Sequence, residues 1–65
     1  MQDYQIRVIE EKKVLDDKIR SLSAFIEHSA IFKNLSFTEQ QQLLHQETVM
    51  LEYSQILGER ISAFV

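Results

Sequence analysis

The sequence predicts an all-α protein, an antiparallel two-helix hairpin that assembles into a homo-oligomeric helical bundle. Apolar residues recur with helical spacing in two long segments, and Ser36-Phe37-Thr38-Glu39 between them has the form of a capping box. The 65 residues contain one glycine, no proline and no cysteine. A hairpin this short covers only part of its apolar surface and has no disulfide to compensate. Self-association is therefore expected to supply the missing burial.

The first helix is expected over residues 3–28. Its apolar residues follow a heptad-like pattern that Lys12 interrupts and that Ile9 and Phe25 widen. Such a broad stripe is typical of a bundle helix with more than one neighbour. Charge pairs such as Asp16 with Arg20 are expected on the outer face. The expected core and interface residues of this helix are Val8, Leu15, Ile19, Leu22 and Ile26.

The connection over residues 29–35 contains Ala30, Ile31, Phe32 and Leu35, whose apolar side chains would be exposed to water in a solvated loop. It is interpreted as a packed bend, with room for one helical turn, whose apolar groups close the end of the bundle. Asn34 is expected to end a helix there, because asparagine tolerates left-handed backbone conformations.

The second helix is expected over residues 36–64. In a capping box the Ser36 hydroxyl accepts from the Glu39 N–H, and the Glu39 carboxylate accepts from the Ser36 N–H. Glu47 interrupts its stripe as Lys12 interrupts the first. Lys12 is expected to reach solvent, to pair with Glu47 across the hairpin, or to set the register and number of chains. The expected core and interface residues here are Leu43, Met50, Leu57, Ile61 and Phe64.

The charge and the hydropathy exclude two classes of partner. Ten acidic and seven basic residues give a net charge of −3, and Lys12 and Lys13 are flanked by acidic residues. General nucleic-acid binding, which needs a basic surface, is not expected. Apolar runs are too short for a membrane span or a signal peptide, so a cytoplasmic location is expected.

The sequence offers no catalytic residues, no cofactor motif and no metal site. His28 and His45 are isolated from other histidines and from carboxylates at helical spacing. Scattered serine, histidine and acidic residues form no recognisable catalytic pattern, and no glycine-rich phosphate loop occurs. The protein is therefore not expected to be an enzyme.

Three polar residues of the second helix form the candidate ligand-binding set. Gln46, Tyr53 and Arg60 are seven residues apart and so share one stripe. Their amide, ring and guanidinium can stack on a base and hold a phosphate or carboxylate, with Lys12 or Lys13 adding positive charge. The alternative is an interface rim, in which tyrosine and arginine are also common.

Small residues recur every four positions at Ser54, Gly58 and Ser62. This strip is expected to let another backbone pack closely, or a planar ligand approach. The alternative is that small residues are simply tolerated on a solvent face, although a helix-interior glycine costs about 1 kcal/mol relative to alanine.

Three motifs span most of the chain: Arg7-Val8-x-x-Glu11-x-x-x-Leu15-x-x-Lys18, Leu22-x-x-Phe25-Ile26 and Gln46-x-x-x-Met50-x-x-Tyr53-x-x-x-Leu57-x-x-Arg60-Ile61. In these motifs the chain resembles a family of small phage and prophage helical proteins related to an uncharacterised open reading frame of a crAss-like phage. The resemblance implies an accessory protein acting inside a host bacterium, and it carries no established active site.

In size and topology the chain is also similar to the short phage hairpins that sequester immune signals, such as anti-CBASS and Thoeris anti-defence proteins. This second resemblance implies that the protein captures a cyclic nucleotide or ADP-ribose-type signal in a pocket between subunits. Two alternatives remain: an inhibitor or adaptor that binds a host protein through an exposed helix face, or a structural or assembly component of the phage.

Overall fold

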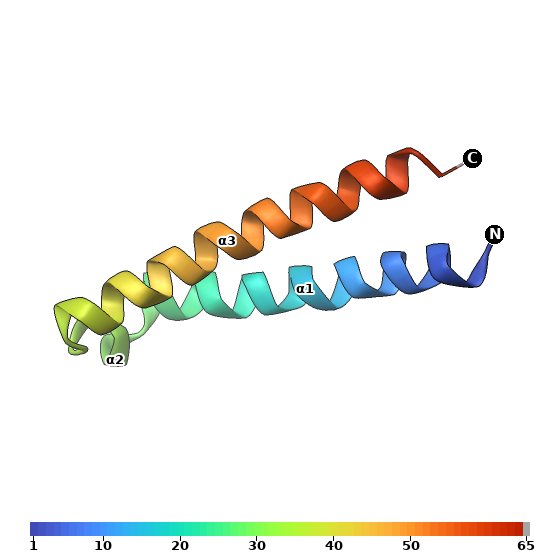
Figure 1. Cartoon of the computed structure of the whole chain (residues 1–65). Coiled ribbons are helices and arrows are strands. Elements are labelled where there is room, and N and C mark those ends of the chain that lie inside the picture. Colours follow the sequence, from blue (N-terminus) through green and yellow to red (C-terminus); the bar gives the residue numbers. More distant parts are fainter. Residues whose placement is uncertain (65) are drawn as a thin grey trace.

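The computed structural model describes residues 1–64, and within them the chain forms three helices: α1 (Asp3–His28), α2 (Ala30–Lys33) and α3 (Phe37–Ser62). The two long helices lie side by side and run in opposite directions, so the start of α1 and the end of α3 lie at the same end of a rod (Figure 1). The rod measures 47 × 15 × 14 Å. The protein is all-helical over the described residues, with α1 packed on α3, as the sequence predicts.

Both ends of α1 are fixed by local hydrogen bonds. The Gln2 N–H donates to Gln5 Oε1 over 2.8 Å, which satisfies a donor that the first turn would leave unpaired. The helix ends at His28 because Ser29 adopts an extended conformation, with φ −85° and ψ 128°. The Ser29 hydroxyl then accepts from the Ile31 N–H over 3.1 Å and caps α2.

The bend between the long helices is tied at several points. Phe32 of α2 packs edge-on against Phe25, with ring centroids 6.1 Å apart. Gln40 in the first turn of α3 donates from Nε2 to the Phe32 carbonyl over 2.9 Å, so it pairs an acceptor that the end of α2 leaves free. Two expectations for this segment are corrected. Ile31 is 66% exposed and does not close the bundle, and Asn34 ends α2 with φ −97°, outside the left-handed region.

The start of α3 uses half of the predicted capping box. Ser36 Oγ accepts from the Glu39 N–H over 3.1 Å. The return bond from the Ser36 N–H to the Glu39 carboxylate is not among the hydrogen bonds of residues 1–64, so the serine alone supplies the cap. The helix ends at Ser62, two residues before the predicted end at 64. Phe64 nevertheless packs on α1, edge-on against Tyr4 with centroids 6.0 Å apart.

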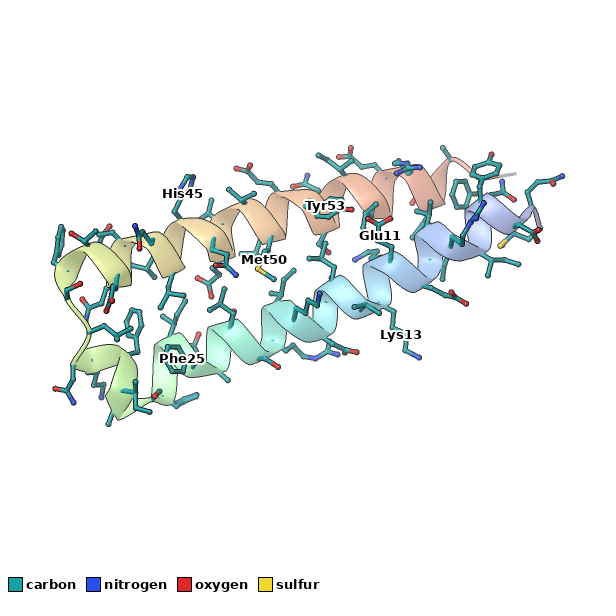
Figure 2. All side chains as sticks on the ribbon, turned by 60° about the horizontal axis from the view of Figure 1, so that its bottom comes forward. Glu11, Lys13, Phe25, His45, Met50 and Tyr53 are labelled. Carbon is teal, nitrogen blue, oxygen red and sulfur yellow. The ribbon has the colours of Figure 1, made fainter. Side chains whose placement is uncertain are left out.

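The core is a single row of apolar side chains between the two long helices. Leu57 is fully buried, at 0% exposed, and lies in one cluster with Val8, Leu15 and Ile19. Met50, Ile61 and Phe64 pack against this cluster, and Figure 2 shows Met50 pointing into the space between the helices. The remaining predicted core residues are only half-buried, namely Leu22, Ile26 and Leu43.

Much apolar surface stays outside this row. The described chain exposes 4982 Å². A compact monomer of 7.7 kDa would expose about 4,300 Å² by the usual scaling with mass, so the excess is roughly 650 Å². Val14, Val49, Leu51 and Ile56 are each about half exposed, at 49–53%. Two helices in contact along one side leave this surface uncovered. No helix among the described residues is long and apolar enough to cross a membrane.

Replacing Leu57 with alanine is expected to destabilise the hairpin by about 2–5 kcal/mol, because it opens a cavity in a core only one residue deep. Urea denaturation followed by circular dichroism would measure the loss. Leu51→Ala is the matched control, since Leu51 lies on the same helix and is 52% exposed. Equal effects of the two substitutions would contradict the assignment of Leu57 to the core.

Candidate ligand-binding site

Tyr53 lies at the edge of a hollow formed between the outer side of α1 and the middle of α3. The hollow measures about 440 Å³ and is open to solvent. Six of its residues come from α1, where they recur once per helical turn and so line one side of the helix. Figure 2 shows Tyr53 and Glu11 close together on this side of the hairpin. The lining residues are Arg7, Glu10, Glu11, Val14, Leu15, Lys18 and Tyr53.

The lining combines the groups that recognise a flat, polar ligand. The Tyr53 ring is 41% exposed, which leaves a face on which another ring can stack. Arg7 and Lys18 can bind an anion, Arg7 in a bidentate manner. Glu10 and Glu11 can accept from hydroxyl or amino groups. The ion pairs of residues 1–64 include none of Arg7, Lys18 and Glu11, so these charges have no ion-pair partner among the described residues.

The other members of the predicted ligand-binding set lie outside this hollow. Gln46 and Arg60 are on the Tyr53 side of α3 but two turns away in either direction, and both are exposed. Gln46 Nε2 lies 3.7 Å from Met50 Sδ on its own helix. Lys13 points away from α3 (Figure 2). The structure therefore places two basic residues of α1, Arg7 and Lys18, beside Tyr53. These are not the basic residues that the sequence analysis expects there.

Lys12 lies in the seam between the helices, where it joins a hydrogen-bonded group with Asp16 and Ser54. Its ammonium donates to Asp16 Oδ2 and to Ser54 Oγ, both over 2.9 Å, and the Ser54 hydroxyl donates to Asp16 Oδ1 over 2.5 Å. Ser54 is 8% exposed, so this group links α1 to α3 inside the hairpin. The three side chains satisfy one another, which is the condition for tolerating polar groups in such a position.

Two predicted charge pairs are corrected by this arrangement. Lys12 pairs with Ser54 and Asp16, whereas Glu47 accepts from the Ser23 hydroxyl over 2.6 Å. Glu47 precedes Ser54 by one heptad, so the predicted contact is displaced by two helical turns, about 10.5 Å. Arg20 pairs with Asp17 instead of Asp16, whose carboxylate is already engaged.

The strip of Ser54, Gly58 and Ser62 lines a second hollow, on the Lys12 side of the seam. It shares no residue with the Tyr53 hollow. A Cβ added at Gly58 would lie 3.4 Å from Lys12 Cε, at the near limit of ordinary van der Waals contact, so the lysine stem passes directly beside the glycine. The strip therefore already has one neighbour within the chain, the Lys12 side chain.

The hydrogen bond from Ser54 holds the pKa of Asp16 below its ordinary value, and the hydrogen bond and charge of Lys12 add to this effect. Desolvation acts in the opposite direction but is weaker than the Ser54 and Lys12 hydrogen bonds. The ionised carboxylate is thus the form that fits the seam.

The histidines are placed at the surface. His28 lies next to Glu27, with Nε2 and Oε2 3.6 Å apart, and His45 points outward from α3 (Figure 2). Among residues 1–64 no three histidine, cysteine or carboxylate side chains converge in a way that could hold a metal ion.

By fold and site the chain is a small all-helical hairpin protein with a solvent-open, mixed-charge hollow beside one tyrosine. It belongs to the Sequestin family, whose model matches residues 2–63. It is also 46% identical over 61 residues to an uncharacterised 7.5 kDa protein from the denB-rIIB intergenic region of Enterobacteria phage T4, with 94% of each chain covered. No solved structure matches the chain.

These relatives support the predicted assignment to small phage proteins. The narrower resemblance to a crAss-like phage reading frame stays a prediction. The sequence interpretation overlooked Arg7 and Lys18, although a signal for them exists. Once the heptad seam of α1 is placed, Arg7, Glu11, Val14 and Lys18 form a neighbouring stripe with steps of four, three and four.

Asp16→Asn is expected to lower the free energy of unfolding at neutral pH. It is also expected to make the decrease of that free energy between neutral and acid pH smaller. A carboxylate with a lowered folded-state pKa stabilises the fold above its unfolded pKa, about 3.9, and that contribution is lost as pH falls through the folded-state value. Urea midpoints between pH 7 and pH 2 would show this. Glu52→Gln, which removes an exposed carboxylate of α3, controls for the change in net charge. Identical pH profiles for wild type and Asp16→Asn would contradict the assigned linkage.

Gly58→Ala separates the two interpretations of the small-residue strip. If only Lys12 faces Gly58, alanine is expected to stabilise α3 by about 0.5–1 kcal/mol through its higher helix propensity. If another chain's backbone packs there, the added methyl group lowers the stability of the assembly. Thermal denaturation at two protein concentrations distinguishes these outcomes, and from the single-chain contacts we expect the first.

Proposed function

We propose that the protein is a non-enzymatic phage accessory protein that counteracts host immunity by sequestering a nucleotide-type signal in the host cytoplasm. The ligand is a cyclic nucleotide or an ADP-ribose derivative, held in a pocket between subunits that includes the Tyr53 hollow. The observation that carries the proposal is the position of the Tyr53 ring beside Arg7 and Lys18. The name of the Sequestin family and the phage relative are consistent with it.

The chemistry of the hollow fits a nucleotide. An exposed aromatic ring stacks on a base at a gain of about 1–3 kcal/mol, as measured by alanine substitution. The guanidinium of Arg7 matches the geometry of a phosphate, and Lys18 adds a second cation to the same lining. Glu10 and Glu11 can bind ribose hydroxyls or the exocyclic amine of a base, which also limits binding by simple inorganic anions.

The hollow is incomplete within one chain. Ligand sites bury most of the ligand surface, whereas this hollow is open on the side away from the hairpin. It offers one ring, so a base stacked there keeps its other face in water. A second subunit that covers the hollow would close this side and would also bury part of the excess exposed surface. We therefore assign the complete pocket to an oligomer.

Binding without catalysis is the proposed mode of action. Glu10 and Glu11 are adjacent in sequence, so their side chains diverge by about 100° around α1 and do not converge on one bond. The buried Ser54 hydroxyl donates a hydrogen bond to Asp16, and it lies outside the hollow. Capture is therefore stoichiometric, and each oligomer removes a fixed number of signal molecules from solution.

Calorimetry against cyclic dinucleotides, cyclic trinucleotides and ADP-ribose derivatives tests the proposal. At least one of them is expected to bind, and heating the complex is expected to release it chemically unchanged. Tyr53→Ala is expected to weaken binding by about tenfold or more through lost stacking, whereas Tyr53→Phe keeps the ring and most of the affinity. Phe37→Ala is the control, because Phe37 is 75% exposed at the other end of α3.

Failure of every compound to bind the folded wild-type oligomer would overturn the proposal. A second candidate function would then stand, that of an inhibitor or adaptor that binds a host protein. Val49 and Ile56 favour it, because they are seven residues apart, 49% and 53% exposed, and on one face of α3. Loss of a co-purified host protein on Val49→Asp, with the Tyr53 variants unaffected, would support that function.

A further inference from the structure

The outer stripe of α1, formed by Arg7, Glu11, Val14 and Lys18, is an unpartnered surface with a knob at its centre. Val14 is 53% exposed. It lies between two hollows, the Tyr53 hollow on one side and a second one lined by Val14, Asp17, Lys18, Ser21 and Leu22 on the other. Val14 and Lys18 line both hollows, so the Val14 side chain separates the two hollows.

We propose that a second copy of the chain packs on this stripe, with the two α1 helices antiparallel and a two-fold axis passing close to Val14. The inference rests on the proposed function in one respect, since it identifies the second subunit of the Tyr53 hollow. The dimer itself can be measured without any ligand. Two features indicate that a second copy covers the stripe: the order of the charges along the stripe, and the amount of surface that the single hairpin leaves exposed.

The order of charges selects the antiparallel direction. Glu11 precedes Val14 by about one turn and Lys18 follows it by about one turn. An antiparallel two-fold axis midway between Glu11 and Lys18, just after Val14, brings Glu11 opposite the partner's Lys18, and the same pair forms again on the other side of the axis. A parallel pair would instead bring Glu11 opposite Glu11 and Lys18 opposite Lys18, which repel.

Both residues are available for such a pair. The ion pairs of the described residues engage Lys12 with Asp16, Arg20 with Asp17 and His28 with Glu27, leaving Glu11 and Lys18 unpaired. Glu10 and Asp17, the nearby acidic residues, each line one of the two hollows, and helical spacing puts both on the edge of the stripe away from Leu15. In the dimer this edge is the solvent-exposed rim, where charge contacts contribute little.

The available surface matches a dimer of ordinary size. The single hairpin exposes roughly 650 Å² more than a compact monomer of its mass. A standard protein interface buries about 800 Å² on each partner. Covering the stripe and the two hollows beside Val14 therefore brings the chain to the exposure expected of a compact protein.

The second copy also completes the ligand site. The partner's Lys18 lies opposite Glu11, so it enters the rim of the Tyr53 hollow and neutralises an acid that lines it. By the same symmetry this chain's Lys18 pairs with the partner's Glu11, so the partner's Lys18 takes its place at the rim, and Arg7 and the Tyr53 ring hold the anionic, aromatic ligand. Two such sites result, one on each side of the axis, and they are related by the two-fold symmetry.

Charge reversal tests the inference by sedimentation equilibrium across micromolar concentrations. Glu11→Lys and Lys18→Glu, made singly, are each expected to raise the dimer dissociation constant about tenfold or more, because each places like charges together twice. The double variant Glu11→Lys/Lys18→Glu restores opposite charges and is expected to recover most of the affinity. Lys13→Glu is the control for net charge, since Lys13 points away from α3 and lies off the stripe.

The knob is tested separately. Val14→Asp is expected to produce a helical monomer, whereas Val49→Asp, at a similarly exposed valine of α3, leaves the dimer intact. Circular dichroism checks that each variant is still helical, and if Val14→Asp does not fold, the charge-reversal series decides. A wild-type monomer at these concentrations, or a double variant no better than the single ones, would overturn the interface. If the wild type is larger than a dimer, recovery in the double variant still identifies the stripe as one of its interfaces.

The outcome for the interface is distinguishable from that for the ligand. A dimer that responds as described but binds none of the nucleotides removes the proposed function and leaves the interface. Nucleotide binding that survives Val14→Asp and both charge reversals overturns the assigned second subunit and leaves a ligand site on the single hairpin.

Discussion

The linkage of Lys12, Asp16 and Ser54 fixes how the two long helices lie against each other, and the rest of the structure depends on that register. Apolar heptads alone would allow α3 to slide by one repeat at modest cost, because leucine, isoleucine and methionine are interchangeable in such a seam. A slide by one repeat in either direction would break the hydrogen bonds that join Ser54 of α3 to Lys12 and Asp16 of α1. Polar groups in the seam therefore specify the alignment that the apolar residues stabilise.

This alignment determines where the candidate site lies. Leu57 is buried among Val8, Leu15 and Ile19. Tyr53 lies one helical turn before Leu57 and faces the flank of α1. Arg7 and Lys18 reach the same hollow because they follow the seam at a fixed angle around α1. The two faces of the hairpin thus differ in character: one carries the ring and unpaired charges, and the other carries the Lys12 group and the small residues.

Most of the fold is predictable from the sequence, because helix periodicity and the Ser36 cap are local signals. The predicted range of α1 agrees with the structure, and α3 differs only at its last turn. Partners across the hairpin are less predictable. The expected Lys12–Glu47 pair is wrong by one heptad, because in the observed register Lys12 faces Ser54 and Asp16 while Glu47 faces Ser23. Likewise, sequence periodicity groups Tyr53 with residues of its own helix, whereas the structure places it beside residues of α1.

The breaks on either side of α2 have a consequence for how copies of this chain can combine. Helical hairpins exchange domains when the connection straightens into one continuous helix. Here Ser29 is extended and caps α2, while Ser36 caps α3 and Gln40 ties the bend to the end of α2. Straightening the connection into one helix would break all of these hydrogen bonds and the Phe25–Phe32 contact. Copies are thus expected to meet as closed hairpins, surface to surface, without swapping arms.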